Sequence, residues 1–434
     1  DRLRSRGLGD VYKRQIKGDA AMDDVRIGIV GLGNMGTLTA DFIYAGDVEH
    51  CVIGAICDIR EERILYAKKH FTHLSEDCFY KDFRKMIAEA MIDAVYIAVP
   101  HYLHQPVATE AFAHGLHVIT EKPEAVYTEA ARQMNEAYEA AVAAYPGLQY
   151  AIMYNQRTNP YYKRIREIAS SGELGALRRV VWNITNWYRT QAYFDSSEWR
   201  ATWEGEGAGV LINQSVHNLD LWQWMLGMPE RIRAFAYEGK YHEIQVEDDV
   251  TIYAEYPGGA TGVFMTSTGE YPGENRLLIQ FDAGKILYDG GALHVWRLSE
   301  GARKFSDDTK QPFGAPDVSY EAVTVPGMET AHRGILNNFV KAILQKDQLI
   351  SPGTEGIYAL SLCNGALLSS WKGDWISFET VANCGDPLFS YENEYKALLK
   401  NKILAAGKNG VSRKKHTKFL DLAANASGGS LGLH

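Results

Sequence analysis

The sequence predicts an α/β N-terminal domain followed by an α+β C-terminal domain with a large, mainly antiparallel open sheet. A β-branched run at 25–30 leads into a glycine-rich turn, and strand and helix patterns then alternate as far as residue 153. Beyond residue 154, strands follow one another through short turns such as 257–259 and 289–291, which is typical of antiparallel sheets. The length of 434 residues also exceeds the usual size of one hydrophobic core.

We expect four regions along the chain. Residues 1–21 are expected to be a non-native or disordered leader, because the first fifteen residues are basic and show little apolar periodicity. The α/β domain is expected at 22–153 and the α+β domain at 154–385. Residues 386–434 are expected to form a C-terminal extension whose end, rich in Gly, Ala, Ser, Asn and Lys, is disordered.

Continuous apolar runs in the α/β domain predict a parallel sheet covered by helices on both faces. A ligand of such a sheet binds beyond the carboxyl ends of the strands. Strands are expected at 25–30, 51–57, 94–99, 117–120 and 150–153, and helices after the glycine-rich turn and at 61–70, 82–90, 104–114 and 129–144.

The α+β domain is expected to begin with a helix at 161–171 and to close with helices at 330–344 and 354–371. A broad sheet with one free face offers an oligomer contact, so we expect a homodimer or homotetramer. The strands of this sheet are expected at 178–188, 231–237, 250–256, 261–266, 277–281, 285–288 and 294–298.

Composition excludes several classes of partner. The net charge of −9 becomes −12 without the first fifteen residues, and no basic cluster lies between them and the C-terminal tail, which argues against nucleic acids and anionic membrane surfaces. We expect a cytoplasmic protein, because no apolar run reaches transmembrane length and no secretory signal precedes residue 25. The five cysteines lack metal-ligand spacing, so we expect reduced thiols and no metal site.

Gly31, Gly33 and Gly36 form a G-x-G-x-x-G pattern directly after the first strand. The first glycine permits a tight turn, the second lets the backbone approach a pyrophosphate, and the third lets the helix pack on the strand. Ordinary glycine-rich turns share this pattern, so a second signal is needed. Asp58 ends the next strand, where a carboxylate bonds the ribose hydroxyls and repels a 2′-phosphate. The sequence therefore predicts NAD, and Arg60 keeps NADP as the less favoured cofactor.

Lys122 follows the strand 117–120, between Glu121 and Pro123. The proline restricts Lys122 to an extended conformation and allows a cis peptide bond. The lysine would then face the cofactor crevice, although a surface lysine before a turn is the ordinary alternative.

Asn213, His217 and Asp220 have the spacing i, i+4 and i+7, which places them on one face of a helix. No second histidine or carboxylate cluster stands beside them, so acid–base chemistry is favoured over zinc. A purely structural histidine is the alternative.

These motifs occur in the order seen in the Gfo/Idh/MocA oxidoreductases, which the chain resembles over about 25–378. The resemblance implies an N-terminal Rossmann domain, a C-terminal sheet domain that forms dimers or tetramers, and NAD(P)-linked oxidation of a sugar or polyol hydroxyl. It assigns cofactor contacts to Gly31, Leu32, Gly33, Asn34, Met35, Gly36, Asp58, Ile59, Arg60, Ala98, Val99, Pro100, His104, Glu121 and Lys122.

The resemblance also implies catalytic roles for Lys122, His217 and Asn213. The family commonly has aspartate where this chain has Asn213, and an amide cannot take a proton. Acid–base work is therefore expected from His217 with Lys122, while Asn213 orients the substrate, and Asp220 either fixes His217 or caps a turn. Substrate contacts are expected from Asn155, Arg157, Tyr188, Asn213 and His217.

Three functions remain open from the sequence. The first is an NAD-dependent sugar or polyol dehydrogenase, and aromatic residues at 187–203 suit a carbohydrate ligand as well as they suit an ordinary core. The second is an enzyme that modifies glycosides with a tightly bound, internally recycled NAD. The third is a non-catalytic nucleotide-binding regulator.

Overall fold

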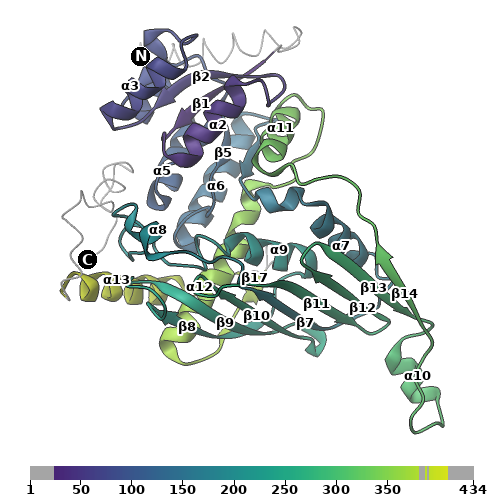
Figure 1. The fold of residues 1–434 in the computed structure, drawn as a ribbon. Helices are drawn as coiled ribbons and strands as arrows, with labels where there is room; N and C mark the ends of the chain where they lie inside the picture. Colours follow the sequence, from purple (N-terminus) through teal and green to yellow (C-terminus); the bar gives the residue numbers. More distant parts are fainter. Residues whose placement is uncertain (1–23, 381–386, 389–390, 409–434) are drawn as a thin grey trace.

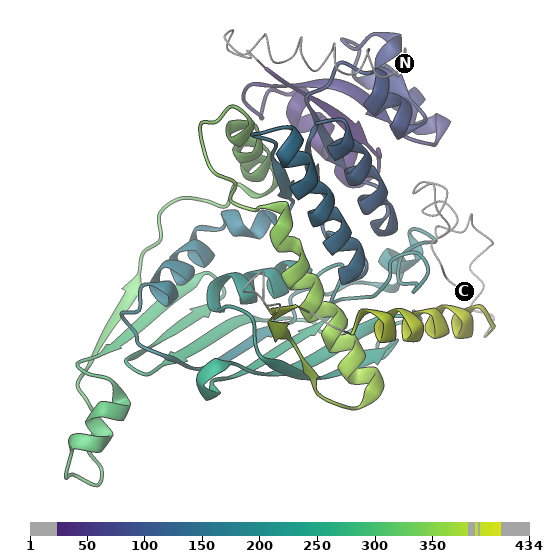
Figure 2. The same ribbon diagram turned by 180° about the vertical axis from the view of Figure 1, so that it is seen from behind.

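The chain builds two sheets, one above the other, with helices packed on each (Figures 1 and 2). The computed structural model describes residues 24–380, 387–388 and 391–408. The predicted leader at 1–21 and the end of the predicted C-terminal extension lie outside these residues. No helix within the described part of the chain is both long enough and apolar enough to cross a bilayer.

Six parallel strands form the N-terminal sheet, in the order β3-β2-β1-β4-β5-β6. The predicted alternation of strand and helix is confirmed. The strand order reverses between β1 and β4, and ligands of parallel α/β sheets bind beyond the carboxyl ends of the strands at such a point. The strands are β1 (Val25–Val30), β2 (Cys51–Cys57), β3 (Phe79–Tyr80), β4 (Ala94–Ile97), β5 (His117–Thr120) and β6 (Tyr150–Ile152), and the helices are α2 (Asn34–Tyr44), α3 (Glu61–His70), α4 (Phe83–Glu89), α5 (His104–Ala113) and α6 (Thr128–Ala144).

Two hydrophobic clusters bury the two faces of this sheet. One face packs against α4, α5 and α6, through residues such as Met86 and Phe112. The other packs against α2, α3 and α11 (Ala331–Ile343), which contributes Leu336 and Phe339. Because α11 comes from late in the sequence and covers the first sheet, the two parts of the chain are tied together through their cores (Figure 1).

Nine strands form the second sheet, in the order β14-β13-β12-β11-β7-β10-β9-β8-β15. Neighbours pair antiparallel except β10 and β7, which are parallel, so the predicted mainly antiparallel sheet is confirmed. The strands are β7 (Leu177–Ile184), β8 (Arg231–Glu238), β9 (Glu247–Glu255), β10 (Thr261–Ser267), β11 (Asn275–Phe281), β12 (Gly284–Asp289), β13 (Ala292–Leu298), β14 (Val318–Val323) and β15 (Ile376–Ser377); β16 (Glu379–Thr380) and β17 (Pro387–Leu388) form a separate pair.

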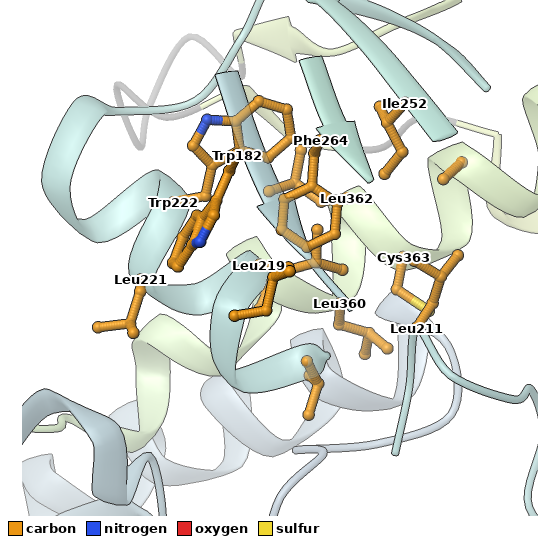
Figure 3. Packing of buried hydrophobic residues seen from close by; sticks show 14 of the residues in the cluster. Trp182, Leu211, Leu219, Leu221, Trp222, Ile252, Phe264, Leu360, Leu362 and Cys363 are labelled. Atoms are coloured by element: carbon orange, nitrogen blue, oxygen red, sulfur yellow. The ribbon is translucent and has the colours of Figure 1, made fainter. Parts of the chain in front are cut away.

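One face of this sheet carries the main core and the other stays open. Trp182 of β7 and Phe264 of β10 pack against Trp222 of α9, whose ring stacks on Phe264 at 5.3 Å between centroids (Figure 3). The open face exposes aromatic side chains, among them Phe235 and Tyr253. The helices of this part are α7 (Pro160–Ser170), α8 (Gln191–Asp195), α9 (Val216–Leu226), α10 (Ala302–Asp308), α12 (Gly356–Lys372) and α13 (Glu392–Lys408).

Several details differ from the sequence-based expectations, and elements such as β3, β14, α8 and α10 were not predicted. The strand expected at 178–188 ends at Ile184, because the amides of residues 185 and 186 both donate to the single carbonyl of Glu274. The helix expected to hold Asn213, His217 and Asp220 is wrong in its start, since α9 begins at Val216. The region 386–434 includes α13, a helix that was not predicted, and its Tyr395 is buried in the main core.

Candidate functional site

The glycine-rich turn lies at the carboxyl end of β1. Gly31 has φ +96, a conformation that favours glycine, and its amide donates to Cys57 O at 2.8 Å. A Cβ on Gly36 would lie 1.8 Å from the Gly31 carbonyl oxygen, so α2 packs directly on the turn. The helix begins after Gly33 without a side-chain cap, which leaves the amides of its first turn free to bind an anion.

Asp58 connects the end of β2 to this turn. Its carboxylate accepts the Leu32 amide at 2.8 Å through one oxygen and the Arg60 amide at 2.9 Å through the other. The Arg60 side chain lies nearby, with Nε 3.6 Å from Asp58 Oδ1. Since a carboxylate oxygen accepts more than one hydrogen bond, Asp58 keeps acceptor capacity beside the turn.

The glycines make separate, testable contributions. Gly33 has φ −68, and a Cβ there would meet no atom within 4 Å. We expect Gly33→Ala to keep the melting temperature and to weaken NADH binding by about tenfold or more, because the new methyl group occupies the space of the pyrophosphate. Gly36→Ala should instead destabilise the fold through its clash with Gly31. Fluorescence titration with NADH and thermal unfolding measure both effects, and an unchanged NADH affinity in Gly33→Ala would contradict this assignment.

The segments that follow β4 and β5 lie close to the glycine-rich turn and to each other. A Cβ added to Gly31 would lie 2.4 Å from the carbonyl oxygen of Ala98, so the segment 98–100 contacts the glycine-rich turn. His104 is buried, and its ring nitrogens lie 2.9 Å from Val99 O and 2.8 Å from Pro123 O. His104 therefore holds these two loops together, and its predicted contact with the cofactor stays a prediction.

Lys122 joins the end of β5 to the segment before α9. Its peptide bond to Pro123 is cis, as the sequence allowed. The ammonium Nζ donates to Asn213 O at 2.9 Å and to Asn213 Oδ1 at 3.3 Å. Burial lowers the pKa of Lys122, and the Glu121 and Glu206 carboxylates oppose that decrease. Glu121 is held in turn by Tyr96, whose hydroxyl donates to Glu121 Oε1 at 2.6 Å.

The turn that carries Asn213 is fixed by a carboxylate that the sequence analysis did not identify. Glu247 is fully buried, and its side chain accepts the amides of Gly209, at 2.8 and 2.9 Å, and Leu211, at 3.1 Å. These bonds hold the backbone in a turn rather than a helix, which is the physical reason that α9 begins only at Val216. Asn213 therefore reaches Lys122 from a turn.

His217 lies in the first turn of α9, is buried, and packs edge-on against Tyr154. Burial lowers the pKa of His217 well below its usual value, and the charge of Lys122 and the neighbouring His332 lower it further. The imidazole is therefore neutral at physiological pH. Its Nδ1 has no hydrogen-bond partner among the residues that the structure describes.

Asp220 and Arg157 form a buried ion pair, which corrects two expectations. Arg157 is fully buried, and its Nε and Nη2 donate to the two Asp220 oxygens at 2.8 and 2.6 Å, while Nη1 donates to Glu355. Asp220 therefore neither orients His217 nor caps a turn. The guanidinium of Arg157 is engaged in this network and is not presented to a substrate.

The other predicted substrate residues lie in different settings. Asn155 is near the site, with Nδ2 3.4 Å from Nδ1 of His332, and its buried Oδ1 has no partner among the described residues. Tyr188 is 44% exposed and packs against Tyr271 at the surface. The structure thus brings Lys122 and Asn213 together beside His217, and adds Glu206 and His332, which no sequence motif indicated. Within the described ranges, no group of His, Cys, Asp and Glu side chains could hold a metal ion.

Comparison with known proteins agrees with this architecture. Residues 25–145 match the model of the oxidoreductase family with an NAD-binding Rossmann fold, and residues 162–287 match the GFO/IDH/MocA C-terminal domain. A curated relative, myo-inositol 2-dehydrogenase of Thermotoga maritima, is 24% identical over 273 residues, which cover 61% of this chain and 75% of the relative.

Two solved structures are similar in fold. The WlbA dehydrogenase from Bordetella pertussis, in complex with NADH and UDP-GlcNAcA, is 24% identical with a TM-score of 0.66, over 82% of this chain and 99% of that chain. Levoglucosan dehydrogenase, in complex with NADH and levoglucosan, is 19% identical with a TM-score of 0.65, over 82% and 99% of the two chains.

Proposed function

The chain belongs to the Gfo/Idh/MocA family of oxidoreductases, and on this premise we propose that it is an NAD-dependent dehydrogenase acting on a secondary hydroxyl of a sugar, glycoside or polyol. The observation that carries the proposal is the meeting of Lys122 with Asn213 beside a neutral, buried His217. Oxidation of an alcohol needs a base for the hydroxyl proton and a donor for the oxygen, and these side chains supply both.

The residues of the chain have distinct roles in this proposal. His217, neutral before the reaction, accepts the proton of the substrate hydroxyl. Lys122 donates a hydrogen bond to the same oxygen and stabilises the negative charge that develops there. Asn213 orients Lys122 and the substrate. The buried Oδ1 of Asn155 is free to accept from a second substrate hydroxyl.

The glycine-rich turn fits a dinucleotide. The open space beside Gly33 and the uncapped start of α2 would receive the pyrophosphate, and Asp58 would bind the adenosine ribose. Bound NAD would supply the hydride acceptor, while the chain supplies position and charge. Asp58 favours NAD over NADP, and NADP remains the second choice because Arg60 lies beside it.

Two arginines favour a substrate that carries an acidic group. Arg200 donates to the Tyr193 hydroxyl at 2.7 Å, and Arg189 lies over the Tyr193 ring at 5.2 Å from its centroid. Both lie close enough to Lys122 to lower its pKa, and the buried Nε of Arg200 has no hydrogen-bond partner in the part of the chain that the structure describes. A sugar carboxylate would therefore bind the N–H groups of Arg189 and Arg200 that are not already donated to the Trp187 and Tyr188 carbonyls or to the Tyr193 hydroxyl.

The open face of the nine-stranded sheet supports a homodimer or homotetramer. Phe235, Tyr253 and Tyr320 are 49%, 37% and 56% exposed. Burial of such aromatic surface between two copies is favourable, and a symmetric contact uses the same face of each subunit.

The test of the function is reduction of the cofactor by defined substrates. Purified protein is incubated with NAD or NADP and a panel of inositols, free sugars, glycosides and hexuronic acids, and nicotinamide absorbance is followed. We expect substrate-dependent reduction of the nicotinamide that is faster with NAD than with NADP. Bound NAD without any reduction across the panel would contradict the dehydrogenase and favour internal recycling of the cofactor or a regulatory role.

A further inference from the structure

The amide of Asn213 lies between a lysine and a carboxylate. Lys122 Nζ donates to Asn213 O at 2.9 Å and to Oδ1 at 3.3 Å. On its other side, the amide donates from Nδ2 to Glu206 Oε1. The second Glu206 oxygen accepts the Ala201 amide at 2.6 Å. The four residues thus form one continuous chain of hydrogen bonds.

The chemistry of the two ends fixes the direction of this chain. A lysine ammonium only donates, and an ionised carboxylate only accepts. The amide between them must therefore turn its oxygen to Lys122 and its nitrogen to Glu206. Reversing the amide would place two donors against each other at Lys122 and two acceptors against each other at Glu206.

We propose that Glu206 is a positioning residue for Lys122 and acts through the amide of Asn213. Glu206 holds that amide with its oxygen towards the ammonium, and its negative charge compensates the charge of Lys122. Two bonds to Asn213 leave the third N–H of Lys122 for the substrate oxygen. The inference rests on the proposed function only in calling Lys122 catalytic.

The burial of Glu206 strengthens this coupling. The residue is 2% exposed, so its interaction with nearby charges is weakly screened. Burial raises the pKa of its carboxyl, and the Ala201 amide, Arg200, Asn213 and Lys122 oppose that increase. Its backbone carbonyl also lies 2.9 Å from Nδ1 of His101, which fixes the turn from the opposite side. Glu206 is thereby held by contacts on its main chain and on both carboxylate oxygens.

Several charged groups face Lys122. Burial lowers its pKa most, the Glu121 and Glu206 carboxylates raise it, and the Arg200 and Arg189 guanidinium groups lower it. Three histidines also lie within electrostatic range, and the charge of Lys122 lowers the pKa of each: His101, His217 and His332. Glu121 is bound by the Tyr96 hydroxyl, whereas Glu206 interacts with the charges of both Lys122 and Arg200.

Exchange of the amide at position 213 and the carboxylate at position 206 tests this chain of hydrogen bonds. Glu206→Gln removes the charge and turns its NH₂ group towards either Asn213 Nδ2 or the Ala201 amide, so two donors face each other at one of these contacts. Asn213→Asp alone places two carboxylates against each other. The double variant Asn213→Asp/Glu206→Gln restores the direction. Its new amide at position 206 donates to the new carboxylate at position 213, and that carboxylate also accepts from Lys122.

The reactivity of the Lys122 amine gives a readout that needs no substrate. Each variant is labelled with isotope-coded acetic anhydride over a range of pH, and the peptide that contains Lys122 is quantified by mass spectrometry. We expect Glu206→Gln to label about threefold faster than the parent at neutral pH, because loss of the carboxylate lowers the pKa of Lys122 and raises the fraction of unprotonated amine. The double variant should label at the parent rate or more slowly. Glu204→Gln, in the same turn, is the matched control and should leave the rate unchanged.

The outcomes separate this inference from the proposed function. An unchanged labelling rate of Lys122 in Glu206→Gln would overturn the proposal that Glu206 positions Lys122, whether or not the protein is a dehydrogenase. A change that the double variant fails to reverse would overturn it as well. Thermal unfolding is measured in parallel. Loss of folding in Glu206→Gln with recovery in the double variant would support the coupling, and loss in both would assign Glu206 to the stability of the turn alone.

Discussion

Replacing Lys122 by methionine is expected to lower kcat by about a hundredfold or more while NADH affinity and the melting temperature change little. The methionine side chain resembles that of lysine in length and in its apolar stem, but it has no ammonium to donate to the substrate oxygen. The Lys122 amine has two bonds to Asn213, so it is held in place before a substrate arrives. Steady-state kinetics with the best substrate of the panel measure the loss.

His217→Ala should lower kcat by a similar factor, because it removes the proposed base and alanine cannot accept a proton. Two surface variants serve as matched controls: Lys310→Met and His114→Ala change the same residue types at exposed positions. Near-normal turnover in Lys122→Met or in His217→Ala would remove the corresponding residue from the chemistry.

Asp220→Ala is expected to lower the free energy of unfolding by about 3–5 kcal/mol, because it leaves the guanidinium of Arg157 buried with only Glu355 as an ionic partner. Asp220→Asn, which keeps the shape and one acceptor oxygen, should cost less. Denaturant unfolding measures both values.

The surface pair Arg276 and Asp289 provides the control for this substitution. Their side chains are 58% and 54% exposed and lie 3.5 Å apart, so Asp289→Ala should change stability by less than about 1 kcal/mol. A loss in Asp220→Ala no larger than that in Asp289→Ala would show that the Arg157 network does not stabilise the fold.

The sequence predicted those parts of the fold whose signals are local. The strand at 25–30, the glycines after it and the helices at 61–70 and 129–144 all follow from periodicity and turn chemistry within a few residues. The open sheet was predicted in the same way, from strands separated by short turns. Lys122 was found because a resemblance joined several motifs that were individually weak.

Contacts between distant segments could not be predicted from one sequence. The spacing of Asn213, His217 and Asp220 suggested a single helix, but Glu247 binds backbone amides of the turn at 209–211, which lie 38 and 36 residues before it. Nothing local to Glu206 indicated that its side chain would meet Asn213.

Arg157 shows the same limit at the predicted substrate site. It was taken for a substrate residue because the segment 154–157 follows the last Rossmann strand and resembles the family's crossover segment, where an Asn or Arg meets the substrate or cofactor. Its partners Asp220 and Glu355 lie far along the chain, so no pattern around residue 157 could indicate that they bury it.

Transfer of a labelled hydrogen tests the central claim most directly. A substrate identified in the panel is prepared with deuterium on the carbon that carries the reacting hydroxyl, and NADH released by the purified protein is analysed by mass spectrometry. Hydride transfer to free NAD predicts that each NADH gains one deuterium and that the Lys122→Met variant releases almost none. Deuterium that stays with the sugar product, while no labelled NADH leaves the protein, would contradict a simple dehydrogenase.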